Sequence, residues 1–186
     1  MNFAQFLSEK INLSQSEIEL LMNNCSTHNF QKKEIILEPF SLSKKIYFVE
    51  EGIIRVFYET DARDITLAFC EKNEISLPVE SVFYDKECKF GIQSVTETKI
   101  IKLNYAVWEQ LCEQNPRLLQ LDKKFLIENI RKFTEHIYST HFKTPKERFD
   151  DLMQSKPAIF NKVPLNTIAS YLGMTQETLS RLRAGK

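Results

Sequence analysis

The chain has 186 residues, of which 42% are hydrophobic, and this length and composition suit one large or two small domains with a buried core. The 25 Lys and Arg residues balance the 25 Asp and Glu residues, so the chain as a whole is not a polycation. No stretch resembles a signal peptide or a membrane span, so we expect a cytoplasmic protein without a membrane partner.

Residues 1–29 are predicted to be helical, and Ser14 and Glu17 have the spacing of a capping box. Residues 30–103 then change to short apolar runs separated by turn signals such as Glu51-Gly52. Regular short strands separated by turn residues predict an antiparallel roll. The expected strands are Glu34–Leu37, Lys45–Glu50, Ile53–Tyr58, Asp64–Phe69, Phe90–Ser94 and Lys99–Leu103.

After residue 103 the pattern becomes helical again. Asn104 is expected to cap a short helix that includes Trp108 and Leu111. Asn115-Pro116 then has the signature of a second helix start, with Asn as the N-cap and Pro at the first helical position, and this longer helix is expected to reach about Thr140. Another capped helix is predicted over residues 144–153.

Apolar residues of the long helix repeat with heptad spacing, which favours a coiled-coil-like dimer seam. A helix packed on its own β-domain would show a similar pattern, and Lys123 interrupts the repeat. We favour the dimer because Leu118, Phe125 and Tyr138 supply a second apolar face that can cover the roll. The predicted seam residues are Leu119, Leu126, Ile130, Phe133 and Ile137.

The segment 165–183 has the spacing of a helix-turn-helix, although an ordinary helical hairpin is the alternative. Ala169 is small enough for two helices to cross closely, and Gly173 falls where the turn needs a positive φ. Thr175 is a natural N-cap for the second helix. Polar side chains of that helix can read base edges or hold phosphates. The predicted DNA contacts are Thr175, Gln176, Glu177, Ser180, Arg181 and Arg183.

Charge is distributed in a way that agrees with DNA binding at the C-terminal end. Residues 1–142 carry 17 Lys and Arg against 21 Asp and Glu, whereas residues 143–186 carry 8 against 4. The basic excess therefore lies in the segment that would meet phosphates. Because the excess is small, we expect modest affinity per subunit and a need for dimerisation.

This order of elements resembles the Crp–Fnr family of bacterial transcription regulators over nearly the whole chain. The most specific segments are 46–58, a strand-glycine-strand hairpin with Arg55 after Gly52, together with 65–69 and 168–181. Residues 144–157 resemble the short linker helix of the smaller, bacteroidete-type members. The resemblance implies an α+β chain with an N-terminal antiparallel β-roll (a double-stranded β-helix or jelly roll) and flanking helices.

The resemblance also implies three parts and their partners. Residues 1–115 would form a cyclic-nucleotide-binding-like sensor, residues 116–142 a dimerisation helix, and residues 143–186 a helix-turn-helix domain that lacks most of the usual wing. The implied partners are double-stranded DNA and a second copy of the chain, with RNA polymerase left open as a further partner. The missing wing keeps a second interpretation open, a ligand-binding or dimerising module with a weakened DNA domain.

The ligand is the point at which the sequence departs from the family. The family's nucleotide pocket uses a Gly-Glu-Leu stretch and a later Arg, whereas residues 70–78 contain no Gly-Glu pair and residues 69–91 contain no Arg. An arginine fork is what a phosphate site normally offers. We therefore expect cyclic AMP binding to be lost, and the cofactor stays unknown. The candidate pocket residues are Phe69, Glu71, Leu77, Val79, Glu80, Ser81, Lys89 and Phe90.

Catalysis is not expected. The sequence has no Gly-x-Ser-x-Gly, His-Glu-x-x-His or phosphate-loop motif. Only His28 lies near the predicted roll, so neither a metal-dependent cupin nor a haem sensor is favoured. The four cysteines are far apart with no Cys-x-x-Cys pair, which favours reduced thiols over disulfides, a zinc ribbon or an iron–sulfur site.

Overall fold

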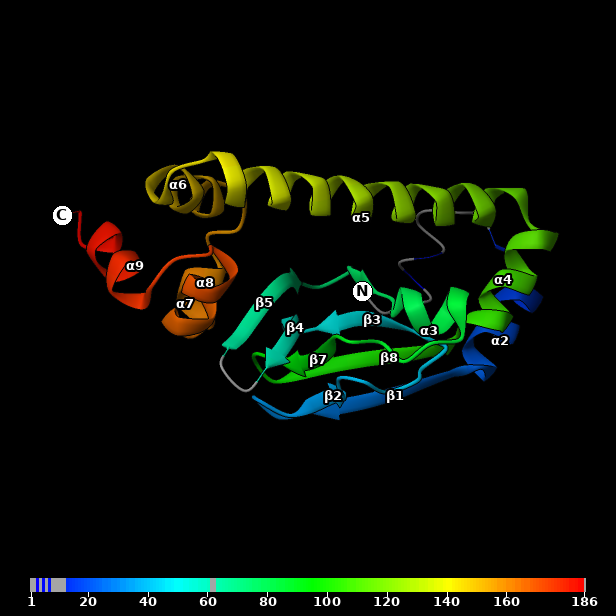
Figure 1. Ribbon diagram of the computed structural model, residues 1–186. Helices are drawn as coiled ribbons and strands as arrows, with labels where there is room; N and C mark the ends of the chain where they lie inside the picture. Colours follow the sequence, from blue (N-terminus) through cyan, green and yellow to red (C-terminus); the bar gives the residue numbers. More distant parts are fainter. Residues whose placement is uncertain (1–2, 4, 6, 8–12, 61–62, 186) are drawn as a thin grey trace.

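Two four-stranded antiparallel sheets form a jelly roll in the computed structural model, which describes residues 3, 5, 7, 13–60 and 63–185 (Figure 1). The first sheet has the order β1-β8-β3-β6, with bounds Cys25–Phe30, Thr98–Asn104, Lys45–Glu51 and Ile75–Ser76. The second has the order β2-β7-β4-β5, with bounds Ile35–Leu37, Gly91–Ser94, Ile54–Thr60 and Arg63–Cys70. The predicted α+β fold with a β-roll is confirmed.

The core of the roll lies between the two sheets, because alternate residues of each strand point inward. Val49 on β3, Ile54 on β4 and Ile100 on β8 are completely buried there. The turn from β3 to β4 passes through Gly52, whose φ is +88°, and a Cβ at this position would lie 2.3 Å from the carbonyl oxygen of Glu97. Glycine is therefore required at this predicted turn.

The prediction of a helix through residue 29 is wrong at its C-terminal end. The helix α2 spans Gln15–Asn23 with the expected capping box at Ser14, and the next element is the strand β1. This strand pairs antiparallel with β8, and its central residues are polar and exposed. Its residues lack apolar alternation, so pairing with β8 is what makes this segment a strand, while Cys25 and Phe30 at its ends pack against the core. Residues 1–2, 4, 6 and 8–12 of the predicted helix lie outside the described residues.

The helices after the roll begin at the predicted caps. Asn104 caps α4 (Tyr105–Gln114), and the side chain of Asn115 accepts hydrogen bonds at the start of α5 (Pro116–Phe142). Four helices follow, α6 (Pro145–Ser155), α7 (Ile159–Lys162), α8 (Leu165–Tyr171) and α9 (Gln176–Arg183). The helix α7 and the strand β6 were not predicted, since each is too short to show a periodic pattern.

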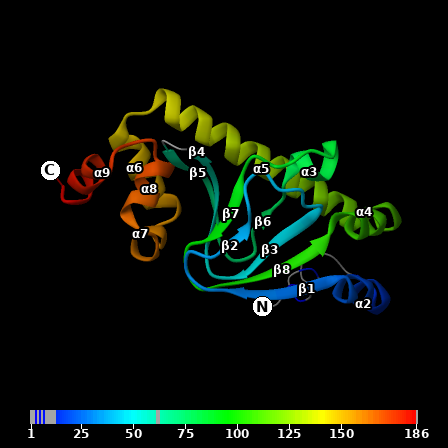
Figure 2. The same ribbon diagram turned by 60° about the horizontal axis from the view of Figure 1, so that its bottom comes forward.

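The long helix α5 runs along the roll, and α6 to α9 gather at one end of the molecule (Figure 1, Figure 2). Leu118, near the start of α5, is completely buried in a cluster with Phe48 of β3 and Trp108 of α4. No described helix is both long and apolar enough to cross a membrane.

Candidate functional site

The helices α8 and α9 pack on each other through a tight turn and a small apolar core. Ile168 on α8 and Leu179 on α9 are completely buried. Gly173 in the turn has a φ of +62°, a conformation that other residues adopt only with strain. Thr175 caps α9, and its hydroxyl accepts a hydrogen bond from the backbone amide of Thr178 at 3.2 Å. The two helices and the short turn between them lie where the sequence of residues 165–183 predicted them.

One side of α9 is polar and faces solvent at the end of the molecule away from the two sheets (Figure 1). Helical spacing places Gln176, Ser180 and Arg183 along one line, with Glu177 and Arg181 beside it. The pKa of Glu177 is lowered by a hydrogen bond from its own backbone amide and then by one from Thr175, so it is a carboxylate at neutral pH. All six predicted DNA contacts are exposed, namely Thr175, Gln176, Glu177, Ser180, Arg181 and Arg183.

Arg148 on α6 connects this unit to α5, and the sequence did not single it out. The side chain is buried and donates three hydrogen bonds to backbone carbonyls. One goes to Gly173 at 3.2 Å, one to Thr140 at 3.2 Å and one to Lys143 at 2.9 Å. The guanidinium therefore ties the turn before α9 to the C-terminal end of α5.

The outer face of β5 holds α8 against the roll. The Ser170 hydroxyl accepts a hydrogen bond from the backbone amide of Thr66 at 2.9 Å and donates one to the carbonyl of Asp64 at 2.8 Å. Phe69 packs against Tyr171 with ring centroids 5.1 Å apart. Phe69, a predicted pocket residue, does not line the cavity inside the roll, because strand alternation turns its side chain toward α8 while Ala68 and Cys70 face inward.

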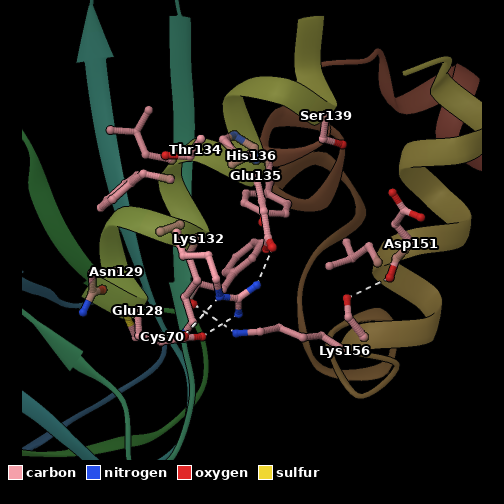
Figure 3. Close-up of a pocket in the computed structure, with 18 of the residues that line it drawn as sticks. Cys70, Glu128, Asn129, Lys132, Thr134, Glu135, His136, Ser139, Asp151 and Lys156 are labelled. Atoms are coloured by element: carbon pink, nitrogen blue, oxygen red, sulfur yellow. Dashed lines mark hydrogen bonds and ion pairs between the residues drawn. The ribbon is translucent and has the colours of Figure 1, made fainter. Parts of the chain in front are cut away.

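An open groove of about 950 Å³ lies between β5, α5, α6 and α8. Lys156, which follows α6, extends across it toward α5 and Lys132 (Figure 3). Its ammonium group lies 3.2 Å from Glu74 and 3.4 Å from Glu71, and Lys132 also pairs with Glu74. Burial raises the pKa of Glu74, but the two lysines and a hydrogen bond from the backbone amide of Glu71 outweigh that effect, and the net shift is downward. Glu71, a predicted pocket residue, thus belongs to this ion-pair network.

A second cavity of about 250 Å³ lies inside the roll and is closed on one side by α5. Four of the eight predicted pocket residues line it, Leu77, Val79, Glu80 and Phe90. Ser81 on α3 (Val79–Tyr84) does not, because its hydroxyl is buried and donates to the carbonyl of Lys86 at 3.0 Å. Lys89 is exposed and also lies outside the cavity lining.

Sequence reasoning missed the contribution of α5 to this cavity. Phe125, Leu126, Asn129 and Phe133 all line it. These positions lie far along the chain from the strands of the roll. Only the path of α5 across the roll brings them together, so no local pattern pointed to them.

Arg55, which follows the glycine of the predicted hairpin motif, does not face the roll cavity. It is buried on the outer face of the second sheet, where its guanidinium makes a two-pronged ion pair with Asp64 at 2.6 and 2.8 Å. Its Nε donates to Gln93 at 2.8 Å. Arg55 therefore stabilises β4, β5 and β7 and is not available to a ligand in the roll.

The predicted seam residues of α5 are all exposed to solvent in the single chain. Ile130 and Ile137 are 65% and 58% exposed, and Phe133 is 46% exposed. Of the second face expected to cover the roll, Leu118 and Phe125 pack inward, but Tyr138 is exposed and stacks beside Phe142. Ile127, which was not predicted, adds to the exposed apolar surface. The complete predicted seam is Leu119, Leu126, Ile130, Phe133 and Ile137.

His136 of α5 stacks on Tyr171 of α8 with ring centroids 4.5 Å apart. Burial lowers the pKa of His136, and the nearby Arg148 lowers it further. The unfolded chain therefore binds a proton on this side chain at higher pH than the folded chain does. The free energy of unfolding should fall as the pH drops below about 6.5 and continue to fall until the folded-state pKa is passed.

Thermal unfolding at pH 7 and pH 5 checks this expectation. The variant His136→Gln should lose less stability on acidification than the unmodified chain. His141→Gln, which removes an exposed histidine of the same helix, is the matched control and should behave like the unmodified chain. Equal acid sensitivity in all three proteins would show that His136 is not the group that titrates.

The described residues contain no cluster of three or more His, Cys, Asp or Glu side chains that could hold a metal ion.

Comparison with known proteins gives a family model for part of the chain. Residues 27–115 match the cyclic nucleotide-binding domain, and this range covers most of the roll and all of α4. No curated protein matches the chain at a significant level.

Several solved structures are similar over most of the chain. FixK2 from Bradyrhizobium japonicum has a TM-score of 0.75 at 16% identity, over 87% of this chain and 83% of that one. The c-di-GMP responsive global regulator CLP of Xanthomonas campestris has a TM-score of 0.72 at 14% identity, over 92% and 91%. A protein from Eubacterium rectale described as a transcriptional regulator of the crp/fnr family has a TM-score of 0.72 at 18% identity, over 94% and 83%. At these identities the likeness concerns the fold.

Proposed function

We propose that the protein is a cytoplasmic, dimeric, DNA-binding transcription regulator of the Crp–Fnr type and not an enzyme. In this proposal the roll senses a signal, α5 joins two copies, and the helix-turn-helix of α8 and α9 reads an operator. The observation that carries the proposal is that α9 is amphipathic. Its buried side is anchored by Leu179, and its solvent side carries six polar side chains that suit DNA.

The polar side chains of α9 support two separate roles, contact with base edges and contact with the DNA backbone. Near the N-terminus of a recognition helix, side chains reach base edges in the major groove. Arg181 suits guanine, Gln176 suits adenine, and Glu177 can accept from the amino group of cytosine. The backbone of the duplex would be held by Arg183 and by the hydroxyl groups of Thr175 and Ser180.

The exposed apolar stripe on α5 supports the dimer. A helix with bulky side chains such as Ile130 and Ile137 in water is typical of a surface that another chain covers. Two copies joined along this stripe would present two recognition helices, and a two-fold symmetric protein reads a near-palindromic site. The seam residues Leu126 and Phe133 also line the roll cavity, so a partner helix would lie close to any ligand held there.

A second candidate function is a ligand-binding or dimerising module with a weakened DNA domain. The observation that favours it is the small basic excess of residues 143–186, 8 Lys and Arg against 4 Asp and Glu. A regulator that relies on phosphate contacts should bind random duplex DNA and lose affinity steeply as salt rises. A mobility-shift assay with random duplex at several salt concentrations separates the two candidates, because a weakened DNA domain would show no salt-dependent shift.

The same assay tests the role of Arg181. After an operator has been selected from a random duplex library, Arg181→Ala should weaken binding to it by about 1–3 kcal/mol, a factor of roughly 5 to 150, and relax the preference at one base position. Lys124→Ala, which removes the same charge from the exposed face of α5, is the control and should leave the selected sequence unchanged. An Arg181→Ala protein with unaltered sequence preference would refute the assignment of Arg181 to base reading.

A further inference from the structure

The cavity inside the roll has walls that are mostly apolar. Val56 of β4 and Ala68 of β5 are paired neighbours on the inner face of the second sheet, and both line the cavity. Trp108 of α4 and Phe125 and Phe133 of α5 add aromatic surface. A volume of about 250 Å³ lies just below the range of about 300–1,000 Å³ that is usual for small-molecule sites. The space therefore suits a small ligand with a large apolar part.

The polar side chains of the cavity lining are rich in hydrogen-bond acceptors. Glu80 Oε2 accepts a weak hydrogen bond from Cys88 at 3.7 Å, and Asp122 Oδ1 accepts one from Trp108 at 2.7 Å. Among the described residues, no donor contacts the second oxygen of either carboxylate. The amide nitrogen of Asn129 donates to the carbonyl of Phe125 at 2.8 Å, which leaves its side-chain oxygen as a third acceptor. The polar lining consists of Ser76, Glu80, Tyr105, Asp122 and Asn129, together with the thiols of Cys70 and Cys88.

No Lys, Arg or His lines this cavity among the described residues, so nothing there balances the two carboxylates. Burial raises the pKa of the Cys70 thiol and of the Tyr105 hydroxyl to about 12 each, and both groups are neutral at physiological pH. Two cations of the adjoining groove, Lys132 and Lys156, already pair with Glu74. The lining therefore holds two carboxyl side chains and no cationic side chain among the described residues.

From these observations we propose that the roll cavity binds a small, largely apolar molecule that carries an uncharged or cationic hydrogen-bond donor, such as an amine or a hydroxyl group. Its donor would bond a free oxygen of Glu80, Asp122 or Asn129, and its apolar part would contact Val56, Ala68 and Phe90. A cyclic phosphate is excluded by the same surface, because it would bring a negative charge to two carboxylates without a cation. This inference rests on the proposed function only in taking the roll as the sensor.

Two fluorescent probes with the same ring skeleton test the charge preference directly. N-phenylnaphthylamine is uncharged and carries one N–H donor, whereas anilinonaphthalene sulfonate adds a single negative charge. Titration of the full chain should show that the uncharged probe binds at least tenfold more tightly, and that cyclic AMP does not displace it. No DNA is present in this assay, so it can succeed or fail independently of operator binding.

Two variants locate the binding in the cavity. Ala68→Phe fills the space and should abolish binding of the uncharged probe, while Tyr84→Ser, on the exposed side of α3, should leave it unchanged. Glu80→Gln removes one carboxylate without changing size, so it should raise the affinity for the sulfonate and shrink the difference between the probes. This last variant keeps the test valid if Ala68→Phe fails to fold.

Three results would overturn the proposal. The first is equal or tighter binding of the sulfonate by the unmodified chain. The second is displacement of the uncharged probe by micromolar cyclic AMP, which would mean that a cation reaches the cavity. The third is a folded Ala68→Phe protein that still binds the uncharged probe, which would place the binding on an exposed apolar patch such as the one formed by Phe83 and Tyr84.

Discussion

Arg148→Met should destabilise the protein by about 3 kcal/mol and abolish DNA binding. The substitution keeps the length and the apolar stem of the side chain but removes all three hydrogen bonds to the carbonyls of Thr140, Lys143 and Gly173. The three hydrogen bonds are partly buried, and the loss of each costs about 1 kcal/mol. Circular dichroism should record a fall in Tm of roughly 6–12 °C for a chain of this size.

Arg131→Met is the matched control for this prediction. Arg131 makes ion pairs with Glu128 and Glu135 on the exposed surface of α5, and such pairs contribute little to stability. Its loss should leave both the Tm and DNA binding close to those of the unmodified chain. If Arg148→Met were as stable as Arg131→Met, the turn before α9 would be held by the apolar core alone.

Ile130→Glu should convert the protein to a monomer. Ile130 lies in the middle of the predicted seam, is 65% exposed in the single chain, and does not line the roll cavity, so its replacement leaves the fold intact. In a dimer the new carboxylate would be buried against an apolar partner helix without a counter-charge, which strongly opposes association. Light scattering should then report the mass of one chain, 21.9 kDa.

Loss of the dimer should also reduce operator affinity by about a hundredfold or more, because the second recognition helix no longer acts at high effective concentration. Lys124→Glu is the control, because it introduces the same side chain on a polar side of α5 away from the seam. This variant should remain a dimer. If Ile130→Glu remained a dimer with full operator affinity, the interface between copies would have to lie on another surface. A monomeric unmodified chain would refute the seam itself.

The structure agrees best with the sequence where a feature depends on a few neighbouring residues. The caps at Ser14, Asn104, Asn115 and Thr144 all accept the expected backbone hydrogen bonds. The apolar strands of the roll lie within a residue or two of their predicted bounds. These features follow from contacts within one turn or one strand, which is the range that a local pattern reports.

Agreement fails where distant segments decide the outcome. The polar strand β1 forms because β8 lies beside it, not because its own residues alternate. The prediction placed Phe69 and Glu71 in the ligand pocket, but the fold turns the first toward Tyr171 and pairs the second with Lys156. The cavity instead takes Asn129 and Phe133 from α5. In each case the deciding contact joins residues far apart in the chain.

The amino-acid sequence by itself determined the order of elements, the polar surface of α9 and the apolar stripe of α5, because helix and strand periodicity place these side chains on defined faces. Only the tertiary structure decided how the parts meet. It placed Arg148 beneath the turn before α9, set α8 against β5, and gathered carboxylates without a cation around the roll cavity. The physical reason is that burial and electrostatics depend on neighbours in space, and the path of α5 across the roll sets those neighbours.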